Sequence, residues 1–209
     1  MNLPNKITLT RIFMIPVFVA VFYCGLLSPW CYLASAIVFL LAALTDALDG
    51  HIARSRHLIT DLGKFLDPIA DKVLVEAAFI VMLTVPDTAF AVQPFGLYGL
   101  ITAGVLIALV LARELIVSGF RIIAAGKKVV LAADKLGKIK TISHDIAITL
   151  LLVAMSLLQY GLAGEIVAYA GLVVFVFCSL MTIISGINYL VKNKAVLKDD
   201  ETKNTEGNS

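Results

Sequence analysis

The chain has 209 residues, of which 60% are hydrophobic, and its formal net charge is only +2. Several apolar runs are about 20 residues long, the length at which an α-helix crosses a hydrocarbon layer ~30 Å thick. An ordinary soluble domain is therefore excluded, and the modest net charge offers no support for a nucleic-acid partner.

Taken in chain order, the apolar runs predict six membrane-spanning helices. We expect an all-α, polytopic membrane protein with one domain over residues 1–192, because no polar stretch is long enough to fold alone. Residues 193–209 are mostly polar, and we expect them to form a disordered cytoplasmic tail. The predicted spans are 7–27, 31–48, 66–86, 97–120, 141–160 and 166–191.

The basic residues predict how these spans are oriented. All 17 Lys and Arg residues fall on one side of the six-span arrangement. The turns on the other side, around 28–30, 87–97 and 160–165, contain none. Because Lys and Arg collect in cytoplasmic loops, we expect a multi-pass protein of the cell membrane with both termini in the cytoplasm.

Four aspartates lie at the ends of the second and third predicted spans that face the cytoplasm. Asp46 and Asp49 are three residues apart, and Asp67 and Asp71 are four apart. Each pair therefore shares one face of its helix. The two helices are consecutive and antiparallel, so the four carboxylates converge if these faces meet. Ionisable side chains within a membrane are expensive, which makes these acids the leading candidates for a functional site.

The chemistry of four clustered carboxylates favours a metal site. Four like charges cannot all stay ionised at close range without a bound cation. Two divalent cations supply the matching charge, and oxygen ligands without Cys or His favour Mg²⁺ or Mn²⁺ over Zn²⁺. Two-metal sites stabilise the attacking and leaving oxygens of phosphoryl displacements, so this chemistry is the expected one.

Small and basic residues accompany the four acids. Gly50 follows Asp49 directly and Gly63 lies four residues before Asp67. Without a Cβ atom, a glycine lets a ligand approach the backbone closely. Arg54 can bind a phosphate through two hydrogen bonds. The complete pattern is Asp46-x2-Asp49-Gly50-x2-Ala53-Arg54-x8-Gly63-x3-Asp67-x3-Asp71.

This pattern resembles the signature of the CDP-alcohol phosphotransferases, integral membrane enzymes that join a CDP-linked lipid to an alcohol and release CMP. The match includes all eight fixed residues across 26 positions, and the resemblance extends from Met1 to about Leu190. The resemblance implies the CDP-alcohol phosphotransferase fold. One departure is His144, which stands where many relatives carry Gln. Four other segments are similar to family motifs, the last three to those of the branch that uses glycerol phosphate: Asn5–Arg11, Gly63–Lys72, Arg113–Glu114 and Gly137–Thr141.

The resemblance also implies roles for individual residues. Asp71 is expected to remove the proton from the acceptor hydroxyl, although the residues alone do not select the base. The two metal ions are expected to bind Asp46, Asp49, Asp67 and Asp71. The CDP-lipid is expected to contact Gly50, Ala53, Arg54, Gly63, Asn5 and Thr8. The phosphate of the acceptor is expected to contact Arg113, Lys138, Arg121 and Lys140.

Ordinary structural roles remain open for several of these residues. Asn5 could instead cap the first helix, and Arg113 could pair with Glu114. Lys138 and Lys140 could simply reflect the excess of basic residues in cytoplasmic segments. Glu76 lies one helical turn after Lys72, and we expect it to form an ion pair, either within its helix or with a neighbouring helix.

The resemblance thus predicts a metal-dependent phosphatidyltransferase that acts on CDP-diacylglycerol and sn-glycerol 3-phosphate. Its expected cofactors are two Mg²⁺ or Mn²⁺ ions, and its expected partners are membrane lipid and a second copy of the chain. The same chemistry with inositol phosphate or serine as the acceptor remains open. A divalent-cation transporter is a remote alternative, because the acids cluster at one end and the outer halves of the spans have few polar residues.

Overall fold

Six long α-helices make up most of the described part of the chain. The computed structural model describes the backbone of residues 3–55, 61–126 and 136–193, and the side chains of residues 9–45, 70, 72–124 and 140–193. No strand occurs within these backbone ranges. The helices are α1 (Leu3–Tyr23), α2 (Trp30–Ser55), α3 (Asp61–Leu83), α4 (Gly96–Gly126), α5 (Leu136–Leu157) and α6 (Leu162–Lys192), with the short 3-10 helices η1 (Cys24–Leu26), η2 (Ala89–Ala91) and η3 (Leu158–Tyr160).

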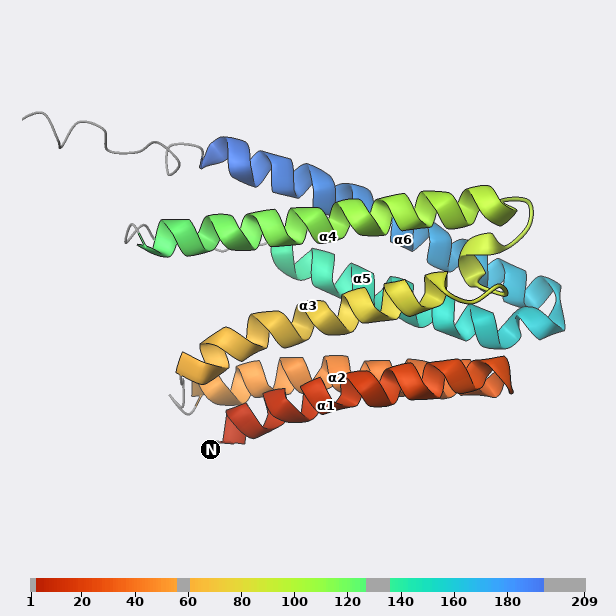
Figure 1. Cartoon of the computed structure of the whole chain (residues 1–209), viewed down its shortest axis with the longest axis horizontal. Coiled ribbons are helices and arrows are strands. Elements are labelled where there is room, and N and C mark those ends of the chain that lie inside the picture. The colour runs from red at the N-terminus through yellow and green to blue at the C-terminus, as the bar shows by residue number, and fades with distance from the viewer. Residues whose placement is uncertain (1–2, 56–60, 127–135, 194–209) are drawn as a thin grey trace, which may run out of the picture.

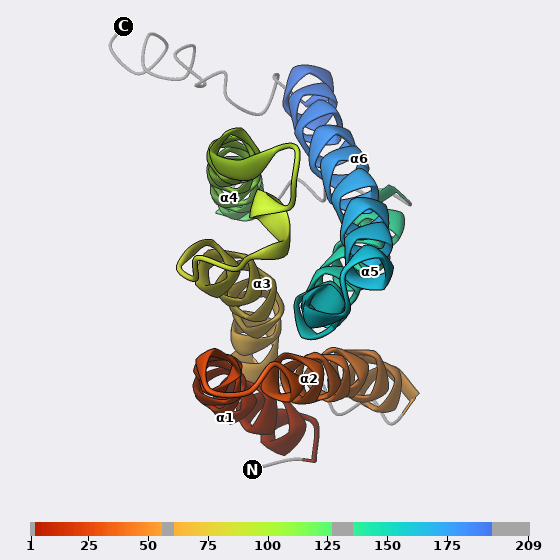
Figure 2. The same ribbon diagram turned by 90° about the vertical axis from the view of Figure 1, so that its right-hand side faces the viewer.

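Consecutive helices run in opposite directions along the long axis of the molecule (Figure 1). The starts of α1, α3 and α5 and the ends of α2, α4 and α6 lie at its left-hand end, which we call the polar end. The connections that contain η1, η2 and η3 lie at the opposite end. Figure 2 shows α1 and α2 as one pair and α5 and α6 as another, with α3 and α4 completing the bundle.

The helices have the length and composition of a multi-pass membrane protein. Within the described residues, four segments are long and apolar enough to cross a membrane: Leu9–Leu26, Gly96–Ala124, Lys140–Tyr160 and Leu162–Lys192. Their outer faces expose large apolar side chains such as Leu115, Val173 and Ile187, which suits contact with lipid. The described apolar part of α2 is shorter, Trp30–Thr45. The crossing of the membrane by α2 and α3 therefore stays a prediction.

The helices extend past the predicted spans at the polar end. The second predicted span stops at residue 48, whereas α2 continues to Ser55; the third starts at 66, whereas α3 begins at Asp61. The glycines of the signature, Gly50 and Gly63, thus lie inside helices and not in a turn. A helix need not stop where its apolar stripe stops, because its backbone hydrogen bonds are internal in water and in lipid alike.

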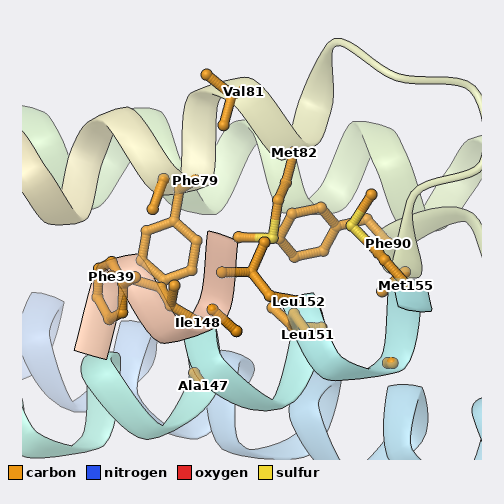
Figure 3. Packing of buried hydrophobic residues seen from close by; sticks show 14 of the residues in the cluster. Phe39, Phe79, Val81, Met82, Phe90, Ala147, Ile148, Leu151, Leu152 and Met155 are labelled. Atoms are coloured by element: carbon orange, nitrogen blue, oxygen red, sulfur yellow. The ribbon is translucent and has the colours of Figure 1, made fainter. Parts of the chain in front are cut away.

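Aromatic and aliphatic side chains around α5 form the core. The ring of Phe175 on α6 lies 5.1 Å, between centroids, from both Phe79 of α3 and Phe90 of η2. Figure 3 shows Phe79 and Met82 of α3 directed toward α5, where Leu152 contributes to the same cluster. All of these side chains are almost fully buried. Their packing holds α3 against α5 and so positions the polar residues that lie nearer the polar end.

Candidate functional site

The four predicted metal ligands lie on helical backbone at the polar end. Asp46 and Asp49 are in the second half of α2, and Asp67 and Asp71 are in the first half of α3. The two helices are consecutive and antiparallel (Figure 1), as the sequence predicts. The side chains of all four aspartates lie outside the described residues, so their convergence stays a prediction.

The donor set fits a hard divalent cation. The spacings of three and four residues fall on continuous helix in both pairs, so each pair shares a helical face. All four donors are carboxylate oxygens, which Mg²⁺ and Mn²⁺ prefer. Among the side chains that the structure does describe, no group of three or more His, Cys, Asp or Glu is placed to hold a metal ion. The aspartates therefore remain the candidate metal ligands.

The predicted CDP-lipid contacts occupy the same end of the bundle. The backbone places Gly50, Ala53 and Arg54 in α2, Gly63 in α3, and Asn5 and Thr8 in α1. Their side chains also lie outside the described residues. Because α1 begins at Leu3, Asn5 lies inside the first turn of the helix, and the alternative that it caps the helix is wrong.

A cavity lies between α3, α4 and α5, and we call it the polar pocket. Its volume of about 50 Å³ leaves room for a small polar group or a few water molecules. Six of its eight lining residues carry a charged, imidazole or hydroxyl group, which is unusual for the interior of a membrane bundle. The lining residues are Lys72, Val75, Glu76, Val110, Glu114, Lys140, Thr141 and His144.

The carboxylate of Glu114 lies between three basic side chains around the polar pocket. One oxygen of its carboxylate, Oε1, accepts hydrogen bonds from Arg113 Nη1 at 2.5 Å and from Lys140 Nζ. The other oxygen, Oε2, lies 3.9 Å from Lys72 Nζ, which also donates to Ser118 Oγ at 2.6 Å. The Glu114 side chain is only 12% exposed. Among the described side chains, this one carboxylate lies close to three cations. Removing it would leave these positive charges with less compensation.

Two of the predicted acceptor ligands meet here, and a third, Arg121, does not. Arg113 and Lys140 share the carboxylate of Glu114, so the expected alternative of an Arg113–Glu114 pair is confirmed. Arg121 lies farther along α4, where its Nε donates to Tyr189 Oη at 3.4 Å and its guanidinium carbon lies 5.4 Å from the ring centroid. The side chain of Lys138 lies outside the described residues. Binding of phosphate by this group stays a prediction.

Glu76 forms no ion pair with Lys72 or with any other described residue, so neither form of its expected pair is found within the described part of the chain. Lys72 turns toward Ser118 and Glu114 on α4 instead. Glu76 is 8% exposed, and its Oε2 has no hydrogen-bond partner among the described residues. One helical turn of spacing permits an ion pair, but an acid on a neighbouring helix competes for the same lysine.

Sequence reasoning assigned no site role to Glu114, Glu76 or His144. A signal was present for Glu114, because it is the only acidic residue in the 31 residues of α4, and an isolated acid in an apolar helix requires a partner. For His144, the only signal was its departure from the Gln of many relatives. Neither signal indicates which helices meet at these side chains.

Gly186 on α6 lets the side chain of Arg113 cross between α4 and α6. A Cβ atom at this position would lie 2.4 Å from both Cγ and Nε of Arg113. Cγ is close to the backbone of α4 and cannot move far without moving that helix. The residue at position 186 therefore determines where Arg113 can lie.

We expect Gly186→Ala to lower the thermal unfolding midpoint in detergent, because overpacking costs ~1–3 kcal/mol. Gly119→Ala is the matched control, since a Cβ there meets nothing within 4 Å. It should keep or slightly raise the midpoint through better helix propensity. In an Arg113→Ala background, Gly186→Ala should cause little further loss. Equal losses in both backgrounds would show that Arg113 is not the residue displaced.

Comparisons with known proteins match most of the chain. A family model described as CDP-alcohol phosphatidyltransferase matches residues 1–183. The chain is 39% identical to a Bacillus subtilis protein named CDP-diacylglycerol–glycerol-3-phosphate 3-phosphatidyltransferase, over 94% of this chain and 97% of that protein. Proteins with the same name from Rickettsia bellii and Salmonella typhimurium are 37% and 34% identical, over 90% and 95% of this chain and 93% and 98% of their own lengths.

Proposed function

The chain belongs to the CDP-alcohol phosphatidyltransferase family, and on this premise we propose that it transfers the phosphatidyl group of CDP-diacylglycerol to sn-glycerol 3-phosphate and releases CMP. The observation that carries the proposal is the placement of the complete eight-residue signature on α2 and α3 at one end of the bundle. The names of the relatives support the choice of both substrates.

The family is generally metal-dependent, and we propose two Mg²⁺ ions, replaceable by Mn²⁺, held by Asp46, Asp49, Asp67 and Asp71. Bound there, the ions would supply charge neutralisation of the diphosphate and acidification of the acceptor hydroxyl. The chemical character of the ligands supports this assignment, because all four are carboxylates on continuous helix.

The remaining steps follow from residues of the chain. The Asp71 carboxylate takes the proton of the acceptor hydroxyl, whose oxygen then bonds to the phosphorus that carries the diacylglycerol. The bond from this phosphorus to the oxygen of CMP breaks, and CMP leaves with the electron pair. Arg54, together with Gly50, Ala53, Gly63, Asn5 and Thr8, holds the CDP moiety. Arg113, Lys138, Arg121 and Lys140 attract the phosphate of glycerol 3-phosphate and hold its hydroxyl near Asp71.

We further propose that the polar end faces the cytoplasm, with both termini on that side. The concentration of basic residues there supports this orientation. Water-soluble glycerol 3-phosphate and the cytidine group then arrive from the cytoplasm, while the acyl chains stay in lipid. Residues 1–192 form the catalytic domain, residues 193–209 form a tail, and the chain works as a homodimer.

The direct test is release of CMP from CDP-diacylglycerol by the purified protein in lipid vesicles, with each acceptor offered separately. We expect release with glycerol 3-phosphate and Mg²⁺, loss of release with EDTA, and recovery when Mg²⁺ is restored. Release only with inositol phosphate or serine would change the acceptor while keeping the chemistry. No release with any acceptor, together with metal flux into vesicles without nucleotide, would overturn the proposal in favour of transport.

A further inference from the structure

Two buried hydrogen-bond acceptors in the polar pocket lack donors among the residues that the structure describes. The Nδ1 atom of His144 lies 2.9 Å from the carbonyl oxygen of Lys140. A carbonyl oxygen only accepts hydrogen bonds, so Nδ1 carries the proton and donates it. In the neutral ring, Nε2 then holds a lone pair. This atom is buried and has no partner among the described residues.

Glu76 presents the second acceptor. Its Oε2 is buried without a hydrogen-bond partner within the described part of the chain. Glu76 is 8% exposed and His144 is 3% exposed, and both line the polar pocket. Two acceptors cannot satisfy each other, and leaving such groups unpaired in a buried site costs ~1–3 kcal/mol each. The pocket therefore suits a small group that donates a hydrogen bond.

The surroundings of the pocket restrict the kind of ligand. Lys140 and Lys72 line the same cavity, and Arg113 is joined to them through Glu114. A ligand in the pocket therefore has both cations and the two acceptors within its lining. An anion that also carries a hydroxyl group satisfies both, because the anion pairs with the cations and the hydroxyl donates to a carboxylate.

The pocket also lies close to the backbone of the proposed base. Val75 lines the pocket and follows Asp71 by four residues, so the two share one face of α3 about one turn, or ~5.4 Å, apart. A three-carbon acceptor can therefore place one hydroxyl at the level of Asp71 and another in the pocket.

We propose that the polar pocket recognises the hydroxyl on the middle carbon of the acceptor, the hydroxyl that does not react. Glu76 accepts its hydrogen bond, and an ordered water that donates to both His144 Nε2 and the oxygen of this hydroxyl connects His144 to the ligand. This inference rests on the proposed function, and it makes Glu76 and His144 the residues that select a vicinal diol phosphate over a simple alcohol phosphate.

The test compares two acceptors that differ only in this hydroxyl: sn-glycerol 3-phosphate and 3-hydroxypropyl phosphate. Both keep the phosphate and the reacting hydroxyl. We expect the wild-type protein to prefer glycerol 3-phosphate by roughly 10- to 100-fold in kcat/KM, the effect of leaving one buried acceptor without its hydrogen bond. In Glu76→Met the preference should fall to about threefold or less, while use of 3-hydroxypropyl phosphate is kept.

Glu76→Gln separates hydrogen bonding from charge. It removes the negative charge as Glu76→Met does but keeps an amide oxygen as an acceptor, so it should retain most of the preference. If Glu76 were only a counter-charge for the lysines, Gln and Met would act alike and both acceptors would lose equally. Glu165→Met is the matched control at the opposite end of the bundle, and it should leave the preference unchanged.

The outcomes distinguish this inference from the proposed function. If Glu76→Met releases CMP with glycerol 3-phosphate and keeps the wild-type preference between the two acceptors, the proposed role of the pocket is overturned while the proposed function stays in place. No release with either acceptor by the wild type would overturn both. If Glu76→Met is inactive on both acceptors, the test is made with His144→Phe instead. This variant keeps an aromatic ring against Phe79, whose centroid lies 5.9 Å from that of His144. Its preference should fall, and an unchanged preference would count against the proposal.

Discussion

Asp71→Asn is expected to lower the rate of CMP release by roughly 10³-fold or more, because one change removes the proposed base and a proposed metal ligand together. Asparagine keeps the size of the side chain but carries no charge and cannot take up a proton at neutral pH. Removing one of four clustered negative charges also relieves repulsion when no metal is bound, so the metal-free variant should unfold at a temperature no lower than the wild type.

Rates with saturating substrates and unfolding midpoints with and without Mg²⁺ test this expectation. Asp87→Asn is the matched control, because Asp87 is exposed at the opposite end of the bundle. It should change neither quantity. Wild-type turnover by Asp71→Asn at ordinary Mg²⁺ concentrations would refute both roles of Asp71. Turnover that recovers only at high Mg²⁺ would keep the metal role and remove the role as base.

Glu114→Gln is expected to cost about 3 kcal/mol of stability and to raise the KM for glycerol 3-phosphate, since three cations then lose their shared counter-charge. Arg113, Lys140 and Lys72 all approach this carboxylate, two of them by hydrogen bonds. The amide can still accept one hydrogen bond, but it cannot balance the charges. The three basic side chains should move apart and hold the acceptor less well.

Thermal unfolding and acceptor kinetics measure the two effects of Glu114→Gln. Adding Lys140→Met to this variant should restore much of the lost stability, because it removes one of the uncompensated charges. Glu165→Gln, on the first turn of α6, is the control and should have little effect. An unchanged midpoint in Glu114→Gln would show that the cluster is well solvated and that its charges do not depend on one another.

At the polar end, the sequence predicted which helices are present but not where they end. The apolar runs located all six helices of the described chain, yet they misplaced the ends at the polar end, where α2 runs on to Ser55 and α3 starts at Asp61. Hydropathy reports where a helix meets lipid, whereas the end of a helix depends on backbone hydrogen bonds and capping. The same argument explains why Asn5 lies within α1 and not at its cap.

The sequence by itself determined the family, the helical class and the candidate metal ligands. These depend on composition and on spacings within single helices, where 3.6 residues per turn fixes which residues share a face. Only the tertiary structure decided that Glu114, and not Glu76, pairs with the basic residues. It also decided that the side chain of Arg113 packs against Gly186, and that Glu76 and His144 line the same cavity. These contacts join residues tens of positions apart, and helices that are apolar on nearly every side carry no stripe from which their mutual rotation can be derived.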